Sequence, residues 1–269
     1  MGSWTLDDIP WHRFDAARVE PELLRIVKAA SLVEQNGADY ARYLCGVFDD
    51  DAAFQDVARR WGAEEVQHGA ALGRWAMLAE PAFDHAAASR RFTAGYRVDI
   101  DATRSIRGSR VGELVARCIV ETGTSSYYTA LAEATQEPVL RQICQRIAAD
   151  ELRHYKLFYT HLKRYLDAEH VGLWRRLAVA LGRVGESEDD ELAYAYYAAN
   201  ESALPYERRR YARAYARRAY SVYRRHHVER GMAMLFKAVG LKPNGRLNRW
   251  TAALAWWGLQ RRAARLARA

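Results

Sequence analysis

Apolar residues recur at intervals of three and four along most of this chain, whereas runs that alternate apolar and polar residues are nearly absent. That spacing places the apolar side chains on one face of an α-helix, so the pattern predicts an all-α protein. We expect four long helices at about 21–48, 52–79, 109–135 and 138–170. Residues 81–107 have no clean period, and we predict a long connection there between the second and third helices.

Two helical hairpins joined by one long crossover have the topology of a ferritin-like four-helix bundle. After the bundle, the pattern predicts a short helix near 173–183, an acid-capped helix at 187–203, and two arginine-rich helices at about 206–239 and 246–268. We therefore divide the chain into an N-terminal segment (1–18), the four-helix bundle (19–170) and a helical extension (171–269).

Charge is distributed unevenly between these parts. Residues 206–269 contain 17 Lys and Arg against two acidic residues, a balance of +15, whereas residues 1–205 contain 24 basic and 31 acidic residues, a balance of −7. The sequence therefore predicts an acidic body with a strongly basic C-terminal segment, which affects the choice of partners.

The cysteines and the first residues bear on the cellular compartment. Cys45, Cys118 and Cys144 are far apart and form no Cys-x-x-Cys pair, which excludes a four-thiolate zinc or iron site and fits a reducing compartment. The chain begins with an acidic, aromatic segment instead of an apolar signal core, and it has no 18-residue apolar run. We expect a cytoplasmic protein, either free or peripheral at a membrane.

Two Glu-x-x-His motifs carry the candidate chemistry. Glu65 and His68 lie in "AEEVQHG" of the second predicted helix, and Glu151 and His154 lie in "ADELRHY" of the fourth. Residues three apart on a helix share a face, so each Glu and its His can reach inward together.

A further Glu precedes each motif on the preceding helix. Glu34 stands 31 residues before Glu65, and Glu121 stands 30 residues before Glu151. One Glu from each of two helices, with Glu-x-x-His from each of the other two, is the ligand set of a di-iron or di-manganese carboxylate centre. Four glutamates also balance the charge of two divalent ions, whereas without metal such crowded carboxylates would repel each other and take up protons. Surface salt bridges are the alternative interpretation.

The segments "WGAEEVQHGAAL" (61–72) and "QICQRIAADELRHYKLFY" (142–159) resemble the two motif regions of the soluble acyl-acyl-carrier-protein desaturases, which belong to the ferritin-like di-iron superfamily. The resemblance covers roughly Val19 to Asp167, and the chain after Asp167 does not resemble that family's C-terminal region. It implies that Glu34 and Glu121 are terminal chelating ligands and that Glu65 and Glu151 bridge the two irons. It also implies that His68 and His154 each bind one iron.

The same resemblance implies roles for two more residues. Asp150 matches an aspartate that hydrogen-bonds the opposite metal histidine, here His68. Thr124 matches a threonine beside the oxygen-binding face of the cluster. Near the start of the chain, Trp4 or Trp11 lies either on an electron path or over a hydrophobic lid, and we favour the lid.

The resemblance implies an oxygen-dependent di-iron oxidoreductase that desaturates or hydroxylates a fatty-acyl chain, with manganese as an alternative to iron in one or both sites. An external, ferredoxin-like electron donor is expected, as is a homodimer. The basic segment 206–269 would contact an acyl carrier protein or an anionic membrane surface, with RNA less favoured. Pairing of its arginines with the acidic bundle, or with a dimer mate, is the alternative. Other functions left open are a tRNA-modifying di-iron hydroxylase and a ferroxidase or peroxidase of the ferritin or rubrerythrin kind.

Overall fold

The structure is a computed structural model that describes residues 4–186 and 190–268. Within these ranges it contains helices and no strands, which confirms the all-α prediction. Three short 3₁₀ helices come first, at Leu6–Asp8, Trp11–Arg13 and Ala16–Arg18. They are followed by α1 (Pro21–Gln35), α2 (Gly37–Val47), α3 (Ala52–Ala79), α4 (His85–Gly95), α5 (Arg110–Ala134), α6 (Pro138–Glu169), α7 (Leu173–Gly185), α8 (Asp190–Asn200), α9 (Arg208–Ser221), α10 (Arg225–Val239) and α11 (Arg246–Arg268).

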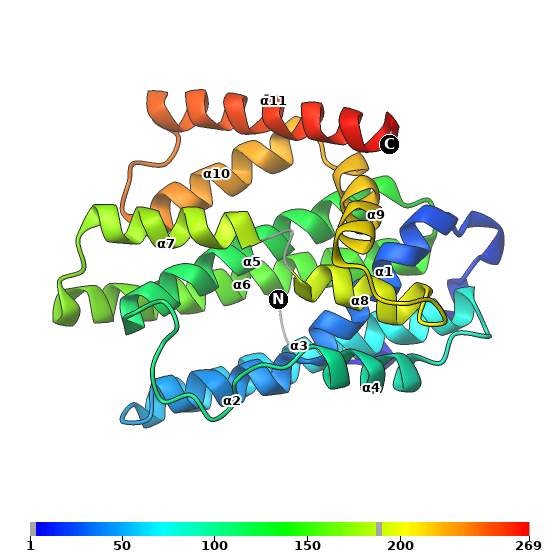
Figure 1. The fold of residues 1–269 in the computed structure, drawn as a ribbon, viewed down its shortest axis with the longest axis horizontal. Helices are drawn as coiled ribbons and strands as arrows, with labels where there is room; N and C mark the ends of the chain where they lie inside the picture. The colour runs from blue at the N-terminus through cyan, green and yellow to red at the C-terminus, as the bar shows by residue number, and fades with distance from the viewer. Residues whose placement is uncertain (1–3, 187–189, 269) are drawn as a thin grey trace.

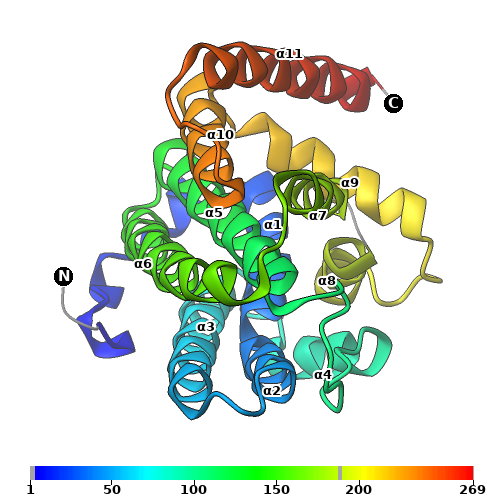
Figure 2. The ribbon, with the colours of Figure 1, turned by 90° about the vertical axis from the view of Figure 1, so that its left-hand side faces the viewer.

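Two helical hairpins form the bundle, as predicted. α1 and α2 pack along α3, α5 packs along α6, and α3 meets α6 across the centre (Figures 1 and 2). Polar side chains begin three of these helices where the sequence pattern placed the boundaries, because each accepts a hydrogen bond from a free backbone N–H of the first turn. These caps are Asp51 for α3, Ser109 for α5 and Glu137 for α6.

The helix predicted at 21–48 is wrong in one respect, because it is interrupted at Asn36. The Asn36 N–H bonds the carbonyl oxygen of Val33, and the chain restarts as α2 at Gly37. The sequence carried a signal for this interruption, since an Asn-Gly pair favours a turn over a continuing helix.

Two other boundaries also differ from the prediction. The connection at 81–107 contains α4, which begins after Asp84 because the Asp84 side chain accepts from the N–H of Ala87. The single helix predicted at 206–239 is two helices, since Arg224 is extended and its N–H donates to the ring of His227 at the start of α10. The start predicted for the acid-capped helix, at 187, lies outside the described residues.

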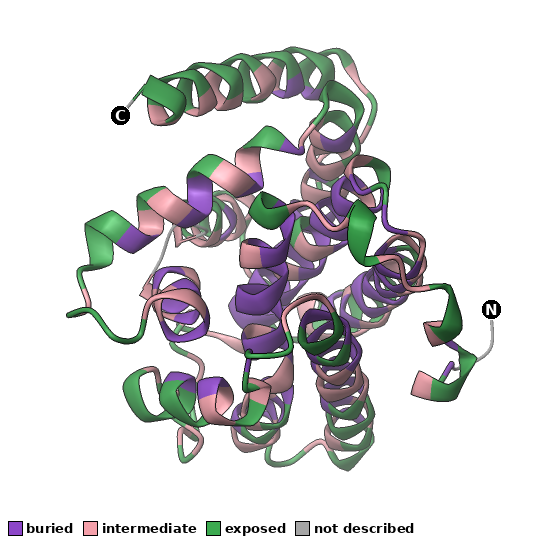
Figure 3. Cartoon of the chain, turned by 90° about the vertical axis from the view of Figure 1, so that its right-hand side faces the viewer, coloured by how far each residue is buried: buried purple, intermediate pink, exposed green. Residues whose placement is uncertain are grey.

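The helices after the bundle pack directly onto it. α8 lies against α1, and α7 and α10 lie against α5. The Tyr155 hydroxyl on α6 donates to the carbonyl of Met234 on α10 over 2.8 Å. A two-pronged ion pair joins Arg107 to Glu186 at 2.5 and 2.6 Å. Buried residues (purple in Figure 3) gather in the centre, whereas α11 at the outer edge is largely exposed. None of the helices in the described part of the chain is both long enough and apolar enough to cross a membrane.

Candidate metal centre

The six residues predicted to bind metal come together in the middle of the bundle. They arrive from four different helices, namely α1, α3, α5 and α6, and their exposed fractions lie between 0 and 7 %. Burial of four carboxyl groups and two imidazoles is costly unless protons or cations compensate their charge. The six residues are Glu34, Glu65, His68, Glu121, Glu151 and His154.

The cluster divides into two overlapping groups of four residues, and in each group one ligand atom per residue lies within 4.8 Å of the others. One group contains Glu34 and His68, and the other contains Glu121 and His154. Glu65 and Glu151 belong to both groups. Two cation positions that share two carboxylates are therefore compatible with this arrangement.

The histidine rings turn the same atom toward the cluster. His68 Nδ1 lies 3.2 Å from Glu151 Oε1, and His154 Nδ1 lies 3.0 Å from Glu65 Oε1. Both Nδ1 atoms are buried without a hydrogen-bond partner among the described residues, and the same is true of both carboxylate oxygens of Glu121. Buried polar atoms are normally satisfied, so this group of orphaned acceptors fits a cation site.

The other ring nitrogen of each histidine is held by a carboxylate. His68 Nε2 lies 3.2 Å from Asp150 Oδ2, and His154 Nε2 lies 2.6 Å from Glu64 Oε2. Arg153 donates to both of these carboxylates. Because an ionised carboxylate only accepts, each Nε2 carries a proton. In the neutral imidazole the lone pair is then on Nδ1 and faces the cluster, which is the tautomer that a metal requires.

Glu64 is a site residue that the sequence analysis missed. The Asp150 contact with His68 was predicted, and Glu64 makes the equivalent contact with the other histidine. The signal was present in the sequence, since an acidic residue immediately precedes the Glu of each Glu-x-x-His motif, Glu64 before Glu65 and Asp150 before Glu151.

Two hydroxyl groups hold further carboxylates. Thr124 donates from Oγ1 to Glu151 Oε2 over 2.7 Å, which places it at the edge of the cluster, on the helix that carries Glu121. Tyr128 donates to Glu34 Oε1. Both contacts restrict the orientation of the carboxylates that they touch.

Trp4 covers the His68 side of the cluster. Its ring stacks on His68 with a centroid distance of 5.9 Å, and its indole N–H donates to Asp150 Oδ2 over 2.7 Å. The carbonyl of Trp4 accepts from the Gln67 side chain at 2.9 Å, which fixes the segment on α3. Trp4 therefore covers the cluster in the position that we favoured for a lid. It is also hydrogen-bonded to Asp150, which in turn contacts His68.

The electrostatics of the cluster follow from its burial. Burial, together with the charge of a neighbouring Glu, raises the pKa of both Glu34 and Glu121 well above the usual range. Burial alone would lower the pKa of His68 and His154, but the surrounding carboxylates raise it well above the usual value. Burial likewise disfavours ionised Asp150, yet hydrogen bonds from His68 and Arg153 bring the pKa of Asp150 to about 2. Without a cation, protons on these groups must balance the charge.

Glycines allow the α1–α2 interruption to approach α3 closely. A Cβ atom on Gly37 would lie 2.3 Å from the Cβ of Glu65, and one on Gly69 would lie 2.5 Å from the backbone nitrogen of Gln35. Any larger residue at these two positions would push the helices apart and displace Glu65 or its neighbours.

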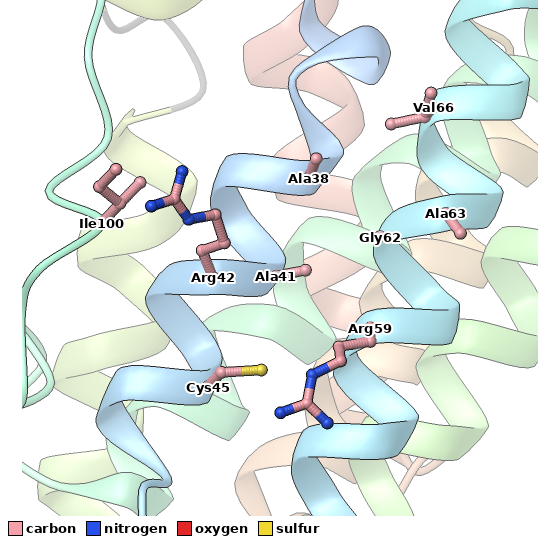
Figure 4. Close-up of a pocket in the computed structure, with 9 residues that line it drawn as sticks. All are labelled: Ala38, Ala41, Arg42, Cys45, Arg59, Gly62, Ala63, Val66 and Ile100. Atoms are coloured by element: carbon pink, nitrogen blue, oxygen red, sulfur yellow. The ribbon is translucent and has the colours of Figure 1, made fainter.

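A groove of about 690 Å³ runs between α2 and α3, with Arg42 and Arg59 on opposite sides (Figure 4). On α3 it is lined by Gly62, Ala63 and Val66, whereas Glu65 points into the bundle. None of the six cluster residues lines it; the remaining lining residues are Ala38, Ala41, Cys45 and Ile100. The groove is therefore separate from the cluster of buried Glu and His residues.

The side of α5 beside Thr124 is more accessible to solvent. Most of α5 is buried, but Gly123 is exposed and Val120 and Thr124 are partly exposed. A Cβ atom on Gly123 would find nothing within 4 Å. Gly123 therefore leaves open space on this face of α5, next to the residue that touches Glu151.

A third group of potential ligands, Glu133, His226 and His227, lies near the surface. His227 Nδ1 accepts the N–H of Arg224 as part of a helix cap, so its proton lies on Nε2, 3.3 Å from Glu133 Oε2. With that nitrogen protonated, His227 has no lone pair left for a metal, and Glu133 forms an ion pair with Arg224 instead.

A protein-family model described as "Fatty acid desaturase" matches residues 36–178, which are 143 of the chain's 269 residues. The chain belongs to the fatty acid desaturase family. No curated protein matches it. The matched desaturase region contains five of the six cluster residues and both Asp150 and Thr124, whereas Glu34 lies two residues before it. Membership of this desaturase family indicates an oxidoreductase that acts on fatty-acyl chains, and the buried Glu and His residues are compatible with a metal site.

Proposed function

We propose that the protein is a di-iron oxidoreductase of the ferritin-like superfamily that uses dioxygen to desaturate or hydroxylate a fatty-acyl chain. The observation that carries the proposal is the pair of overlapping four-residue groups sharing Glu65 and Glu151 inside a desaturase-family bundle. Two bound iron ions would supply the activation of dioxygen that removal of hydrogen from an unactivated C–H bond needs.

The donor set fits such ions. Each position has one terminal carboxylate, from Glu34 or Glu121, and one imidazole nitrogen, from His68 or His154. Carboxylate and imidazole ligands suit iron and manganese alike, so manganese remains an alternative in one or both positions. The four glutamates carry −4 against the +4 of two divalent ions, so the loaded centre is close to neutral.

The surrounding residues have supporting roles in this proposal. Asp150 and Glu64 keep the proton on the outer nitrogen of each histidine, and Thr124 orients Glu151. Electrons from an external, ferredoxin-like donor would reach one metal position through the hydrogen-bonded series Trp4, Asp150 and His68, so Trp4 would serve this path in addition to covering the cluster.

We place the approach of the acyl chain on the accessible side of α5. Gly123 leaves space there, and the neighbouring Thr124 touches a shared carboxylate. Gly123→Leu would fill this space, so we expect slower turnover of the acyl substrate at unchanged metal content. Unchanged turnover would exclude this route.

Metal content and product analysis together test the function. The wild-type protein, produced with ample iron, should contain two metal ions per chain. After reduction and reoxidation in air it should show an optical absorption from the metal centre. With a reductant and acyl-carrier-protein-linked fatty acids, mass spectrometry should detect loss of two hydrogens or gain of one oxygen. Glu65→Ala should abolish metal binding and the acyl product, because Glu65 belongs to both groups. His154→Ala should lose one of the two ions and the acyl product. Stably folded, metal-free wild type would refute the proposal, and iron oxidation without an acyl product would indicate a ferroxidase.

The tRNA-hydroxylase alternative depends on arginines and tyrosines that alternate in α9. Tyr211 and Tyr215 are buried against the rest of the molecule, and α9 packs on α8 and α1. These two rings are therefore not available to stack on bases, and the acyl substrate remains our proposal.

A further inference from the structure

The outer face of α11 carries a continuous apolar stripe. The helix lies on the outside of the molecule over α9 and α10 (Figure 1), and it buries Asn248 and Ala252 against them. On its opposite face, large apolar side chains recur at intervals of three and four with 46 to 63 % of their surface exposed. They are Leu247, Trp250, Leu254 and Trp257. A row of exposed apolar residues on one helix face indicates a binding surface, unlike isolated ones.

The same helix is strongly basic. It contains six arginines and no acidic residue. The guanidinium carbon of Arg261 lies 3.8 Å from the ring centroid of Trp257, so charge and apolar stripe are adjacent. Arg246, Arg249, Arg265 and Arg268 form no ion pair with any residue in the described ranges.

We propose that the outer face of α11 docks on an anionic phospholipid surface, with the helix axis parallel to the membrane. The tryptophans and leucines would enter the boundary between headgroups and acyl chains, and the arginines would contact the lipid phosphates. The stripe from Leu247 to Trp257 is about 15 Å long at the rise of an α-helix. α11 lies on the membrane and does not cross it, in keeping with the absence of a membrane-spanning helix among the described residues.

Charge and shape favour this occupant over the others. A second copy would bring two copies of α11 together around a two-fold axis, arginine against arginine with no acid to pair. An acidic carrier protein would neutralise the arginines without requiring the tryptophans. RNA would stack on aromatic rings, but Leu247 and Leu254 offer none. A lipid surface satisfies both the charge and the apolar stripe.

This docking goes beyond the proposed oxidoreductase function and does not depend on it. α11 packs on α10, and Gly231 of α10 lies beside Thr122 and Ser126 of α5. Thr122 follows Glu121 directly in the chain. Docking would therefore bring the bundle to a lipid surface, where fatty-acyl chains are concentrated, with only α10 between α11 and the helix that carries Glu121.

Sedimentation with lipid vesicles tests the docking without metal or substrate. The full chain is mixed with vesicles of phosphatidylcholine alone or of phosphatidylcholine with phosphatidylglycerol, and the bound fraction is measured against lipid concentration. We expect binding to the anionic vesicles that weakens with salt. Trp250→Ala/Trp257→Ala should weaken it at least about tenfold, because each indole removes on the order of 100 Å² of apolar surface from water. Arg265→Gln/Arg268→Gln should weaken binding to the anionic vesicles by about 30-fold, at about 1 kcal/mol per arginine.

Trp174→Ala on α7 is the matched control, because Trp174 is 82 % exposed and lies on a different helix. It should bind vesicles as the wild type does, and all variants should keep the wild-type circular dichroism. Absence of vesicle binding by the wild type would overturn the proposal. Full binding by the double-tryptophan variant, or an equal loss in Trp174→Ala, would also overturn it. The proposal would also be overturned if vesicles do not bind and Trp250 and Trp257 are needed instead for dimer formation, or for retention on an acidic carrier protein or on RNA.

Discussion

Replacing Glu121 by Gln should remove one metal ion and leave the other. Glu121 belongs to one four-residue group only, and Gln keeps its size while removing the charge. We expect the metal content to fall from two ions per chain to one. Glu34→Gln should remove the other ion, whereas Glu65→Gln should remove both because Glu65 belongs to both groups.

The same substitution should have the opposite effect on the metal-free protein. Burial, and then the charge of Glu151, raises the pKa of Glu121 well above its usual range. A carboxyl group with a raised folded pKa costs stability as the pH rises above its unfolded pKa, with about 1.4 kcal/mol per pKa unit. Glu121→Gln should therefore stabilise the metal-free chain at pH 7, by at least about 2 °C in melting temperature. At pH 4 this gain should disappear.

In the loaded protein the sign reverses. An ion present at 100 times its dissociation constant stabilises the folded state by about 2.7 kcal/mol, so two ions contribute about 5 kcal/mol. Loss of one ion should lower the free energy of unfolding by about 2.7 kcal/mol. This loss exceeds the stabilisation from Glu121→Gln in the metal-free protein if that stabilisation is about 1.4 kcal/mol, which corresponds to one pKa unit.

Two measurements check the reasoning on the same preparations. Elemental analysis after desalting gives ions per chain, and thermal unfolding is followed by circular dichroism with metal or with chelator. A Glu121→Gln variant that keeps two ions or loses both would refute the assignment of two positions. A clear drop in the metal-free melting temperature at pH 7 would refute the electrostatic argument.

Further expectations concern the surroundings of the cluster. Asp150→Asn should lower metal affinity by about 10 to 100 fold in a chelator competition, since the acceptor of His68 loses its negative charge, and Glu64→Gln should do the same for the other histidine. Gly37→Ala should cost about 1–3 kcal/mol in urea unfolding and reduce metal content, because the added methyl group collides with a shared carboxylate side chain. Gly123→Ala, which meets nothing, should stabilise α5 by up to about 1 kcal/mol, and a loss of stability there would contradict the accessible space. The hydrogen bond from Arg107 lowers the pKa of Glu186, so the ion pair stabilises the fold where Glu186 is ionised. Glu186→Gln should therefore lower the free energy of unfolding by up to about 1 kcal/mol at pH 7, and by progressively less below about pH 4.5. An equal loss at pH 3 would contradict this.

The six clustered residues could be predicted because their spacing is local. Glu and His stand three positions apart in each motif, and the preceding Glu stands 31 or 30 positions before the Glu of the motif. Glu64, the carboxylate that holds His154, was not predicted, although it directly precedes Glu65 in the sequence. Its contact joins positions 90 residues apart, and it depends on how α3 crosses α6.

The sequence by itself determined the helices and the residues that share one face of each, because helical periodicity is a property of neighbouring positions. It also determined the charge of the C-terminal segment. Only the tertiary structure decided which carboxylates are shared, that Trp4 reaches Asp150, and that the stripe on α11 faces outward while Tyr211 and Tyr215 of α9 face inward. These contacts depend on how closely and at what angle helices pack, which side chains distant in sequence settle together.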